Sequence, residues 1–326
     1  MAVLWMSAAL AAIALSLSST VRSETDRATT NSEGLRAWYL ATGSVERGIQ
    51  WMMWGEGYRN QDGSPKFWEP NRSRMPMTYP SGDAVVEMIP ESSKLNVNTA
   101  SFDDLQRLIT ILTADPGRGG AIAEAIVAWR SSGGQPSFGP APTFQARHAS
   151  LQEIEELLAV PGVTPELFYG SFTADAAARS YPRDGLKDCL SVWGSQGPFD
   201  ANTASPGLLE AFGMQRAAVE ALLAKRKEAP FVQRDFAALG LPGGKFSLGG
   251  NTVWTLRATA RLRHPDGRPA DVVRSAAAVV KLLDRRQYFM NPVHVLRYYE
   301  DAWSQFALQP KAVPGAPVLA VLPGAR

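Results

Sequence analysis

The residues able to do catalytic chemistry are few and scattered. Among 326 residues there are three histidines, His148, His264 and His294, and one cysteine, Cys189. They lie far apart in the sequence, and no Ser–His–Asp or Cys–His set can be assembled from them. A single cysteine can form neither an intrachain disulfide nor a cysteine-based metal site. The sequence therefore predicts that the protein is not an enzyme, with no catalytic residues and no cofactor.

Two short motifs approach a binding pattern without completing it. Gly243-Gly244-Lys245 lacks a preceding Gly at the correct spacing and the following Ser or Thr of a phosphate-binding loop. Asn60, Asp62 and Gly63 are spaced like the start of a calcium loop, but the distal bidentate Glu has no counterpart. We interpret the first motif as a loop with a solvated Lys and the second as a turn, and we leave metal binding open.

The first 20 residues predict a membrane-embedded helix. Ala2 to Thr20 contain no charge, Pro or Gly. At about 1.5 Å of rise per residue this stretch is just long enough to cross most of a bilayer's hydrocarbon core. A cleaved secretory signal and a plain membrane anchor remain alternatives, although a signal needs a basic segment before its apolar run and none is present. The residues predicted to contact membrane or neighbouring helices are Leu4, Trp5, Leu10, Ile13 and Leu17.

A helical pattern continues past the apolar run to about Trp54. Apolar residues recur every three or four positions, which draws one stripe along a helix. We therefore expect one helix of roughly 50 residues, about 80 Å long, with an apolar start and an amphipathic stem. The stem residues predicted to pack on a sheet are Leu35, Trp38, Val45, Ile49 and Met52.

Strand patterns lie on both sides of a long helical region. Residues 55–80 are rich in Gly, Pro and Asn and predict a loop, and 83–89 predict a strand. After residue 250, residues 254–262 alternate cleanly, 264–268 predict a turn, and 272–283 and 293–299 predict two more strands. The strand near residue 85 must then join a sheet with the strands after residue 250, near residue 255. The helical region between them is therefore an insertion into a small α+β unit.

The helical region contains an internal duplication. The letters Asn-Thr-Ala-Ser occur at 98–101 and again at 202–205, each time after a short extended piece and before a helix. Thr or Ser there can cap the helix that follows. Each copy then has a second helix ending in a basic residue, 121–130 and 215–226, and another helix pair lies between the copies at 150–160 and 164–172. We take Asn98, Thr99, Asn202 and Thr203 as the openings of two related helix–turn–helix repeats.

The predicted organisation is therefore α+β, with a long helix and an antiparallel sheet interrupted by an all-α insertion. The predicted segments are a transmembrane segment over residues 1–21, the stem 22–55, the loop and first strand 56–90, the insertion 91–250 with repeats at about 94–190 and 197–250, the remaining strands 251–300 and a loose tail 301–326.

This order of segments resembles the K-type minor pseudopilin family of bacterial type II secretion systems, over nearly the whole chain. The resemblance rests on five stretches: LRAWYLATGSVERGIQWMMWG at 35–55, IPESSKLNVNTAS at 89–101, ARHASLQEIEELLAVPGVTPELFYG at 146–170, GPFDANTASP at 197–206 and GGNTVWTLRATARL at 249–262. It implies a pilin-like helix and sheet interrupted by a large domain of SAM-like helical repeats. It also implies a structural role at the tip of the periplasmic pseudopilus that supports protein secretion.

The resemblance further implies partners and a location. The partners are the I-type and J-type minor pseudopilins, the major pseudopilin, the inner-membrane assembly platform and, for the precursor, the prepilin peptidase. The chain would cross the bacterial inner membrane once, with its bulk in the periplasm. Some family members bind calcium, but no ligands can be assigned here. Two departures stand out: Met1 falls inside the apolar helix where a basic leader ending in Gly is expected, and no acidic residue occurs from Met1 to Ser23.

A membrane-anchored helix-hairpin-helix protein that binds DNA is the alternative. Such modules need a Gly–apolar–Gly turn whose backbone amides meet phosphate. The turn at 113–120 and the one at 212–215 lack that pattern, and Arg118 is the only basic residue in the first. The net charge of +2 is spread along the chain, so no nucleic-acid partner is expected.

Overall fold

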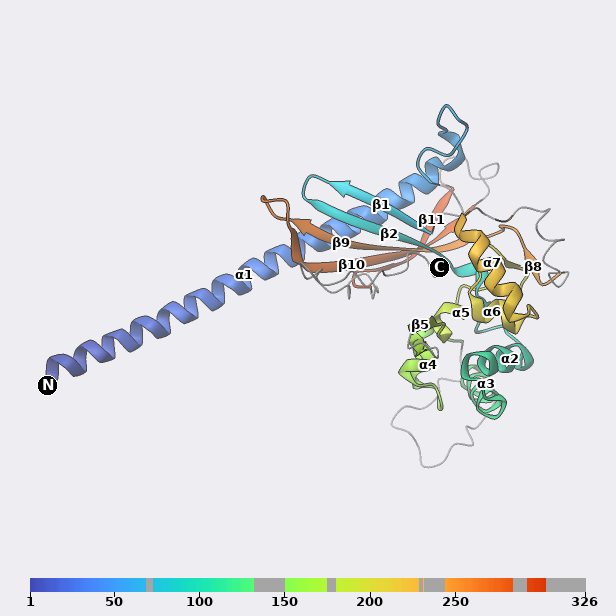
Figure 1. Ribbon diagram of the computed structural model, residues 1–326, viewed down its shortest axis with the longest axis horizontal. Coiled ribbons are helices and arrows are strands. Elements are labelled where there is room, and N and C mark those ends of the chain that lie inside the picture. Colours follow the sequence, from blue (N-terminus) through green and yellow to red (C-terminus); the bar gives the residue numbers. More distant parts are fainter. Residues whose placement is uncertain are drawn as a thin grey trace.

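One helix runs from the start of the chain into the body of the protein. The computed structural model describes residues 1–68, 73–131, 150–174, 180–228, 231, 244–283 and 292–302. Helix α1 spans Ala2–Trp54, 53 residues, and is about 80 Å long. It ends at Gly55, whose φ of 34° interrupts the helical backbone, and a 3₁₀ turn, Gly55–Gly57, follows. The single long helix predicted from the sequence is confirmed, and its first half extends alone from the body (Figure 1).

A five-stranded antiparallel sheet packs on the second half of α1. Its order is β1-β2-β9-β10-β11, and its strands are β1 Arg74–Tyr79, β2 Gly82–Pro90, β9 Val253–Arg263, β10 Pro269–Leu282 and β11 Val293–Tyr299. Strand β2 pairs along its whole length with β9, from Gly82 opposite Leu262 to Pro90 opposite Trp254. Residues between these two strands therefore form an insertion, as the alternating patterns predicted.

Strand β1 corrects the prediction of a loop over residues 55–80. It lies at the sheet edge and pairs only with β2, with Pro76 opposite Val85. Proline lacks a backbone donor, so it is tolerated at an edge strand but disfavours a strand prediction from sequence. Met75 and Met77 point into the core, which makes β1 part of the packed layer.

The face of α1 against the sheet consists largely of small residues. The buried positions are Gly34, Ala37, Ala41, Ser44, Val45, Gly48, Ile49 and Met52. A Cβ added at Gly48 would lie 3.0 Å from Leu256 Cδ2, so the helix backbone approaches β9 closely there. Leu35, predicted to pack on the sheet, is instead 56% exposed. At about 100° per residue, Leu35 is rotated about 80° around the helix from Val45, which takes it off the buried face.

The insertion contains more than helices. Its helical elements are η2 Glu91–Ser93, α2 Phe102–Thr113, α3 Pro116–Arg130, η3 Ile154–Ala159, α4 Pro165–Tyr169, α5 Leu186–Cys189, α6 Pro206–Ala211 and α7 Arg216–Glu228. Its short strands are β3 Leu95–Asn96, β4 Ser171–Ala174, β5 Ser180–Arg183, β6 Leu190–Ser191, β7 Phe199–Asp200 and β8 Phe246–Ser247. The all-α prediction is therefore wrong in detail: β4 and β5 form an antiparallel pair, and β3–β6 and β7–β8 pair in parallel.

Two helix boundaries also differ from the predictions. Helix α3 begins at Pro116 rather than Ala121, because Asp115 caps it and Pro is well suited to a first helical position. The segment predicted as a helix over 150–160 is a 3₁₀ helix, and residue 172, predicted to end the next helix, lies in β4. Residues 303–326 of the predicted tail lie outside the described residues.

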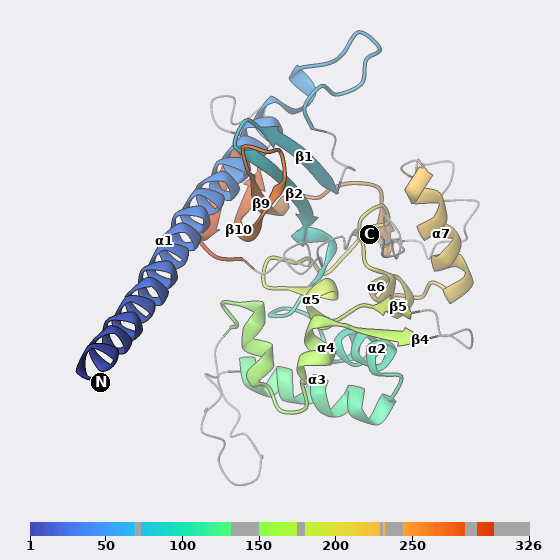
Figure 2. The same ribbon diagram turned by 60° about the vertical axis from the view of Figure 1, so that its left-hand side comes forward.

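The molecule has two separate hydrophobic cores. One lies between α1 and the sheet and includes Val45, Met75 and Trp254. The other fills the insertion and includes Leu105 and Phe199. Figure 2 shows the insertion as its own body beside the end of the sheet, away from the start of α1. The two units are joined where β2 leads into β3 and where β8 leads back into β9.

Candidate functional site

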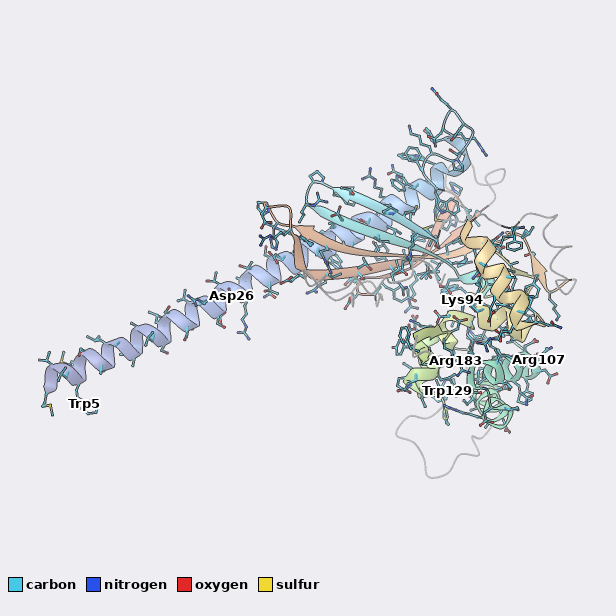
Figure 3. The ribbon with its side chains drawn as sticks, in the orientation of Figure 1. Trp5, Asp26, Lys94, Arg107, Trp129 and Arg183 are labelled. Carbon is cyan, nitrogen blue, oxygen red and sulfur yellow. The ribbon has the colours of Figure 1, made fainter. Side chains whose placement is uncertain are left out.

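The free half of α1 is the most exposed apolar surface that the structure describes. Trp5 is 77% exposed and projects from the helix without touching the body (Figure 3). The other predicted contact residues are also exposed: Leu4, Leu10, Ile13 and Leu17 are each 62–68% accessible. Among the described residues, α1 is the one helix long and apolar enough to cross a membrane, judged by length and composition. Such a surface needs a lipid or protein partner.

Charged residues begin where the apolar run ends. Arg22, Glu24, Asp26 and Arg27 are all exposed, and Arg27 forms a 3.4 Å ion pair with Glu24 one turn earlier. Pairs this exposed contribute little to stability. Burial against the sheet starts only at Gly34. The helix thus has an apolar segment, a short charged segment and a buried segment, in that order.

The opening of the first repeat is a hydrogen-bonded clamp. Asn98 Nδ2 donates to the Leu151 carbonyl at 2.9 Å, and Asn98 Oδ1 accepts from the Leu151 N–H at 2.7 Å. The Asn98 N–H donates to Asn96 Oδ1 at 2.9 Å, which fixes the turn before α2. Ser101, not Thr99, caps α2 by accepting from the Asp104 N–H at 3.1 Å.

The second repeat reproduces the same clamp with different partners. Asn202 Nδ2 donates to the Phe231 carbonyl at 3.3 Å and Oδ1 accepts from the Phe231 N–H at 2.7 Å. Ser205 caps α6 by accepting from the Leu208 N–H at 3.4 Å. Thr203 does not cap the helix but donates to Asp200 Oδ2 at 3.0 Å. The matching bonds indicate that the repeated letters encode one structural unit used twice.

An arginine in the last turn of the second helix of each repeat is directed inward. Arg130 donates through both terminal nitrogens to the carbonyls of Val97 and Ala100. Arg226 donates through Nη1 to the carbonyls of Ala201 and Ala204, at 3.2 and 2.8 Å. Burial lowers the pKa of Arg226 to about 10 and also lowers the pKa of Arg130, because the charged form loses water.

The repeated sequence predicts the two opening asparagines, but it does not predict the residues to which they bond. Leu151 lies 53 residues after Asn98 and Phe231 lies 29 after Asn202, so no common spacing marks the pairs. The available signal was the Ser at the fourth repeated position, which is the usual N-cap residue type. The sequence marks the basic residues at 130 and 226 as helix ends, and no pattern predicts their inward hydrogen bonds.

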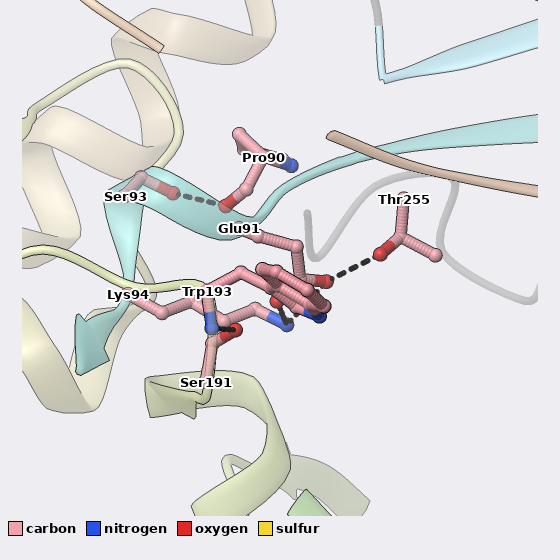
Figure 4. Close-up of polar contacts among 7 residues, drawn as sticks. All are labelled: Pro90, Glu91, Ser93, Lys94, Ser191, Trp193 and Thr255. Atoms are coloured by element: carbon pink, nitrogen blue, oxygen red, sulfur yellow. Dashed lines mark hydrogen bonds and ion pairs between the residues drawn. The ribbon is translucent and has the colours of Figure 1, made fainter. Parts of the chain in front are cut away.

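The junction between the units is built from polar side chains (Figure 4). Glu91 Oε1 accepts from Lys94 Nζ at 3.2 Å and from Thr255 Oγ1 at 2.8 Å, so it ties the insertion to β9. At the return crossover, Asn251 Nδ2 donates to Asp200 Oδ2 at 2.7 Å, and Ser92 Oγ donates to Asn251 Oδ1 at 3.2 Å. Glu91 and Asp200 are both buried, and their carboxylates are satisfied by these donors.

The residues considered for chemistry do not converge. His264 lies 4.0 Å from Glu33, His294 is on the exposed strand β11, and His148 lies outside the described residues. Cys189 is fully buried beside Ser205 Oγ at 3.1 Å, and burial raises the pKa of its thiol well above the usual value. No group of three or more His, Cys, Asp or Glu that could hold a metal occurs among the described residues.

In the incomplete calcium-loop and phosphate-loop motifs, the polar side chains make local contacts. The Asn60 N–H donates to the Ser64 carbonyl and Gly63 N–H to the Asn60 carbonyl, at 2.9 and 3.0 Å, which forms a closed turn. The Ser64 N–H and hydroxyl both donate to Asp62 Oδ1, and these bonds lower the Asp62 pKa. Lys245 lies 5.9 Å from the Phe212 ring centroid, and Gly243 lies outside the described residues.

Together these features define an α+β protein in which a long helix with a free apolar half packs on an antiparallel sheet that carries a duplicated helical insertion. No family model and no curated protein matches the chain. Among solved structures, one similar chain belongs to the GspK–GspI–GspJ complex of the enterotoxigenic Escherichia coli type 2 secretion system. The TM-score is 0.48 at 16% identity, over 87% of this chain and 100% of that chain.

Proposed function

We propose that this chain is a membrane-anchored structural subunit of a type II secretion pseudopilus, a minor pseudopilin of the K type located at the tip. The observation that carries the proposal is the division of α1. Its sheet-packed segment begins at Gly34, and the uncharged, largely apolar residues 2–20 near its start are exposed. An exposed apolar helix must be covered, and in a filament subunit the membrane and the helices of neighbouring subunits can cover it.

The apolar segment of α1 supports a single membrane crossing. From the family resemblance we further propose that this membrane is the bacterial inner membrane and that the sheet and insertion lie in the periplasm. The proposed partners are the I-type and J-type minor pseudopilins, the major pseudopilin, the assembly platform and the prepilin peptidase. On α1, Leu35 and Tyr39 are 56% and 63% exposed beside the sheet-packed face, so they are available to a neighbouring subunit.

Site-specific photo-crosslinking in a bacterium with an active type II secretion system tests this function. A photoreactive residue at Tyr39 should give light-dependent adducts with other pseudopilins. The same residue at Glu124, which is exposed on α3 of the insertion, serves as the control for random collisions. If the full-length chain is in the membrane fraction but Tyr39 yields no pseudopilin adduct, the proposal is wrong.

The DNA-binding alternative gains no support from the arginines of the two repeats. Arg130 and Arg226 bind backbone carbonyls within their own repeats and are not directed at a ligand. Arg118 extends toward the Gly162 carbonyl at 3.5 Å. We therefore expect no useful affinity for duplex DNA at physiological salt, since binding requires several phosphate contacts. Submicromolar, steeply salt-dependent binding in a gel-shift titration would favour the alternative.

A further inference from the structure

The orientation of the insertion depends on polar contacts. Among the described residues the two hydrophobic cores share no member, so in this part of the chain no continuous apolar core fixes one unit against the other. The two crossovers lie side by side, since Pro90 and Trp254 are register partners on β2 and β9. Two adjacent strands leaving one end of a sheet make a single line of attachment, about which an appended unit can pivot.

A second attachment lies away from the crossovers, on the edge strand β11. Tyr299 OH donates to Glu153 Oε2 at 2.8 Å, and Arg297 Nη2 forms an ion pair with Glu153 Oε1. Glu153 belongs to the insertion, just before η3. Tyr299 is the register partner of Ala277, which pairs with Arg257. This contact is therefore three residues along the sheet and two strands across from Trp254, roughly 10 Å in each direction.

Neighbouring groups hold in place both sides of the contact between Glu153 and strand β11. Glu156 Oε1 accepts from the backbone N–H groups of Gln152 and Glu153, at 2.9 and 3.1 Å, so the backbone at Glu153 is held in place. The Asn98 clamp fixes the preceding Leu151. On β11, the Arg297 guanidinium lies 5.3 Å from the Tyr299 ring centroid, which orients both donors.

The contact is partly shielded from water. The side chains of Glu153 and Arg297 are 25% and 43% exposed. Burial, the bond to Glu153 and the charge of Glu153 together raise the pKa of Tyr299, so its hydroxyl stays protonated and continues to donate. A shielded, charge-assisted pair is stronger than the exposed ion pairs on α1.

We propose that Glu153, Arg297 and Tyr299 form a latch that sets the orientation of the insertion, and that the insertion pivots about the two crossovers when the latch is removed. The latch residues come from two units with independent cores, so their loss leaves each unit folded. The insertion is then a movable head on the sheet, tied at the crossovers by Glu91 and Asn251 and kept from pivoting about them by Glu153. This inference does not depend on the proposed function.

Distances between spin labels on the full-length chain in detergent test the latch. Labels at Thr78→Cys on β1 and Glu124→Cys on α3, both exposed, report the orientation in a Cys189→Ala background. With the latch intact we expect a narrow distance distribution, and Glu153→Ala should broaden and shift it. Gln152→Ala, an exposed neighbour in the same segment, is the matched control and should leave the distribution narrow.

Three further variants decide the remaining outcomes. Charge reversal by Glu153→Arg should broaden the distribution, and adding Arg297→Glu should narrow it again. If Glu153→Ala loses its cooperative thermal transition, the double variant Arg297→Met with Tyr299→Phe removes both donors without altering the insertion. A narrow, wild-type distribution in a folded Glu153→Ala protein, or in that double variant, overturns the proposal.

Discussion

At the scale of single residues, the insertion is organised by side chains that bond to backbone. Asn98 and Asn202 each satisfy one N–H and one carbonyl of a distant residue, and Arg130 and Arg226 each satisfy two carbonyls. Irregular segments leave such groups without the partners that helices and sheets provide. The polar residues shared by the two repeats therefore stabilise the turns between helices and are not directed at a ligand.

Asn98→Ala and Asn202→Ala should each destabilise the insertion. Each change leaves a backbone N–H and a carbonyl unpaired in a partly buried place, at an expected cost of about 2 kcal/mol. The measurement is urea unfolding of the full-length chain in detergent, followed by tryptophan fluorescence. Asn31→Ala on the exposed half of α1 is the control and should change stability by less than about 0.5 kcal/mol. Equal effects of the three substitutions would contradict the clamp assignment.

Cys189 should be unreactive while the insertion is folded. Its side chain is fully buried and its pKa is raised by burial, so both access and thiolate are lacking. Because the folded-state pKa is raised, the unfolded state loses its thiol proton first as pH rises, and stability falls above the unfolded pKa of about 8.5. A thiol reagent at pH 8 should react slowly with the native chain and fast in urea. Rapid reaction of the native chain would refute this burial.

At the scale of elements, the contact between α1 and the sheet is a close fit of small residues. Val45 is fully buried, whereas Leu35, ten residues earlier, is 56% exposed. Both are large aliphatic residues on the predicted stripe. Substitutions at Val45 and Leu35 therefore test the buried face seen in the structure against the stripe predicted from the sequence.

Val45→Asp should unfold the helix–sheet unit, and Leu35→Asp should not. An unpaired carboxylate at Val45 would lie in the core beside the sheet, at a cost of at least about 3 kcal/mol. The same carboxylate at Leu35 stays in water, with an expected effect within about 0.5 kcal/mol. Circular dichroism melting of both full-length variants in detergent provides the comparison. Similar melting of the two variants would mean that the buried face is misassigned.

The sequence predicted the elements that have a clear period and missed those that lack one. The sequence of β9 alternates cleanly, and the positions of β2, β9 and β11 agree with the predictions within about two residues. Strand β1 was missed because Pro76 argues against a strand unless its edge position is known. The two-residue strands β3, β6, β7 and β8 are too short for any periodicity. Gly34 and Ala37 do not stand out in the sequence because small residues carry little hydrophobic signal, although they lie on the buried face of α1.

At the scale of the whole molecule, the parts are arranged along one long axis. The apolar start of α1 lies at one end, and the insertion lies beyond the opposite end of the sheet (Figure 1). The insertion, about residues 91–250, leaves the sheet through the crossovers at Pro90 and Asn251 and adds its bulk on one side. A protein of this shape can be anchored in a membrane through α1. Its insertion extends far beyond the cross-section of the helix and sheet.

The shape predicts that the subunit occupies the end of a filament and not its shaft. In a helical shaft each subunit is closely surrounded, so a head formed by about half of the chain would clash with a neighbour at every repeat. A terminal subunit has open space on one side. We expect gold label on a C-terminal tag to appear at one end of sheared pseudopili, and a tagged major pseudopilin is the control for label along the whole length. Regularly spaced label from this chain along the shaft would refute the tip position, whatever its other partners are.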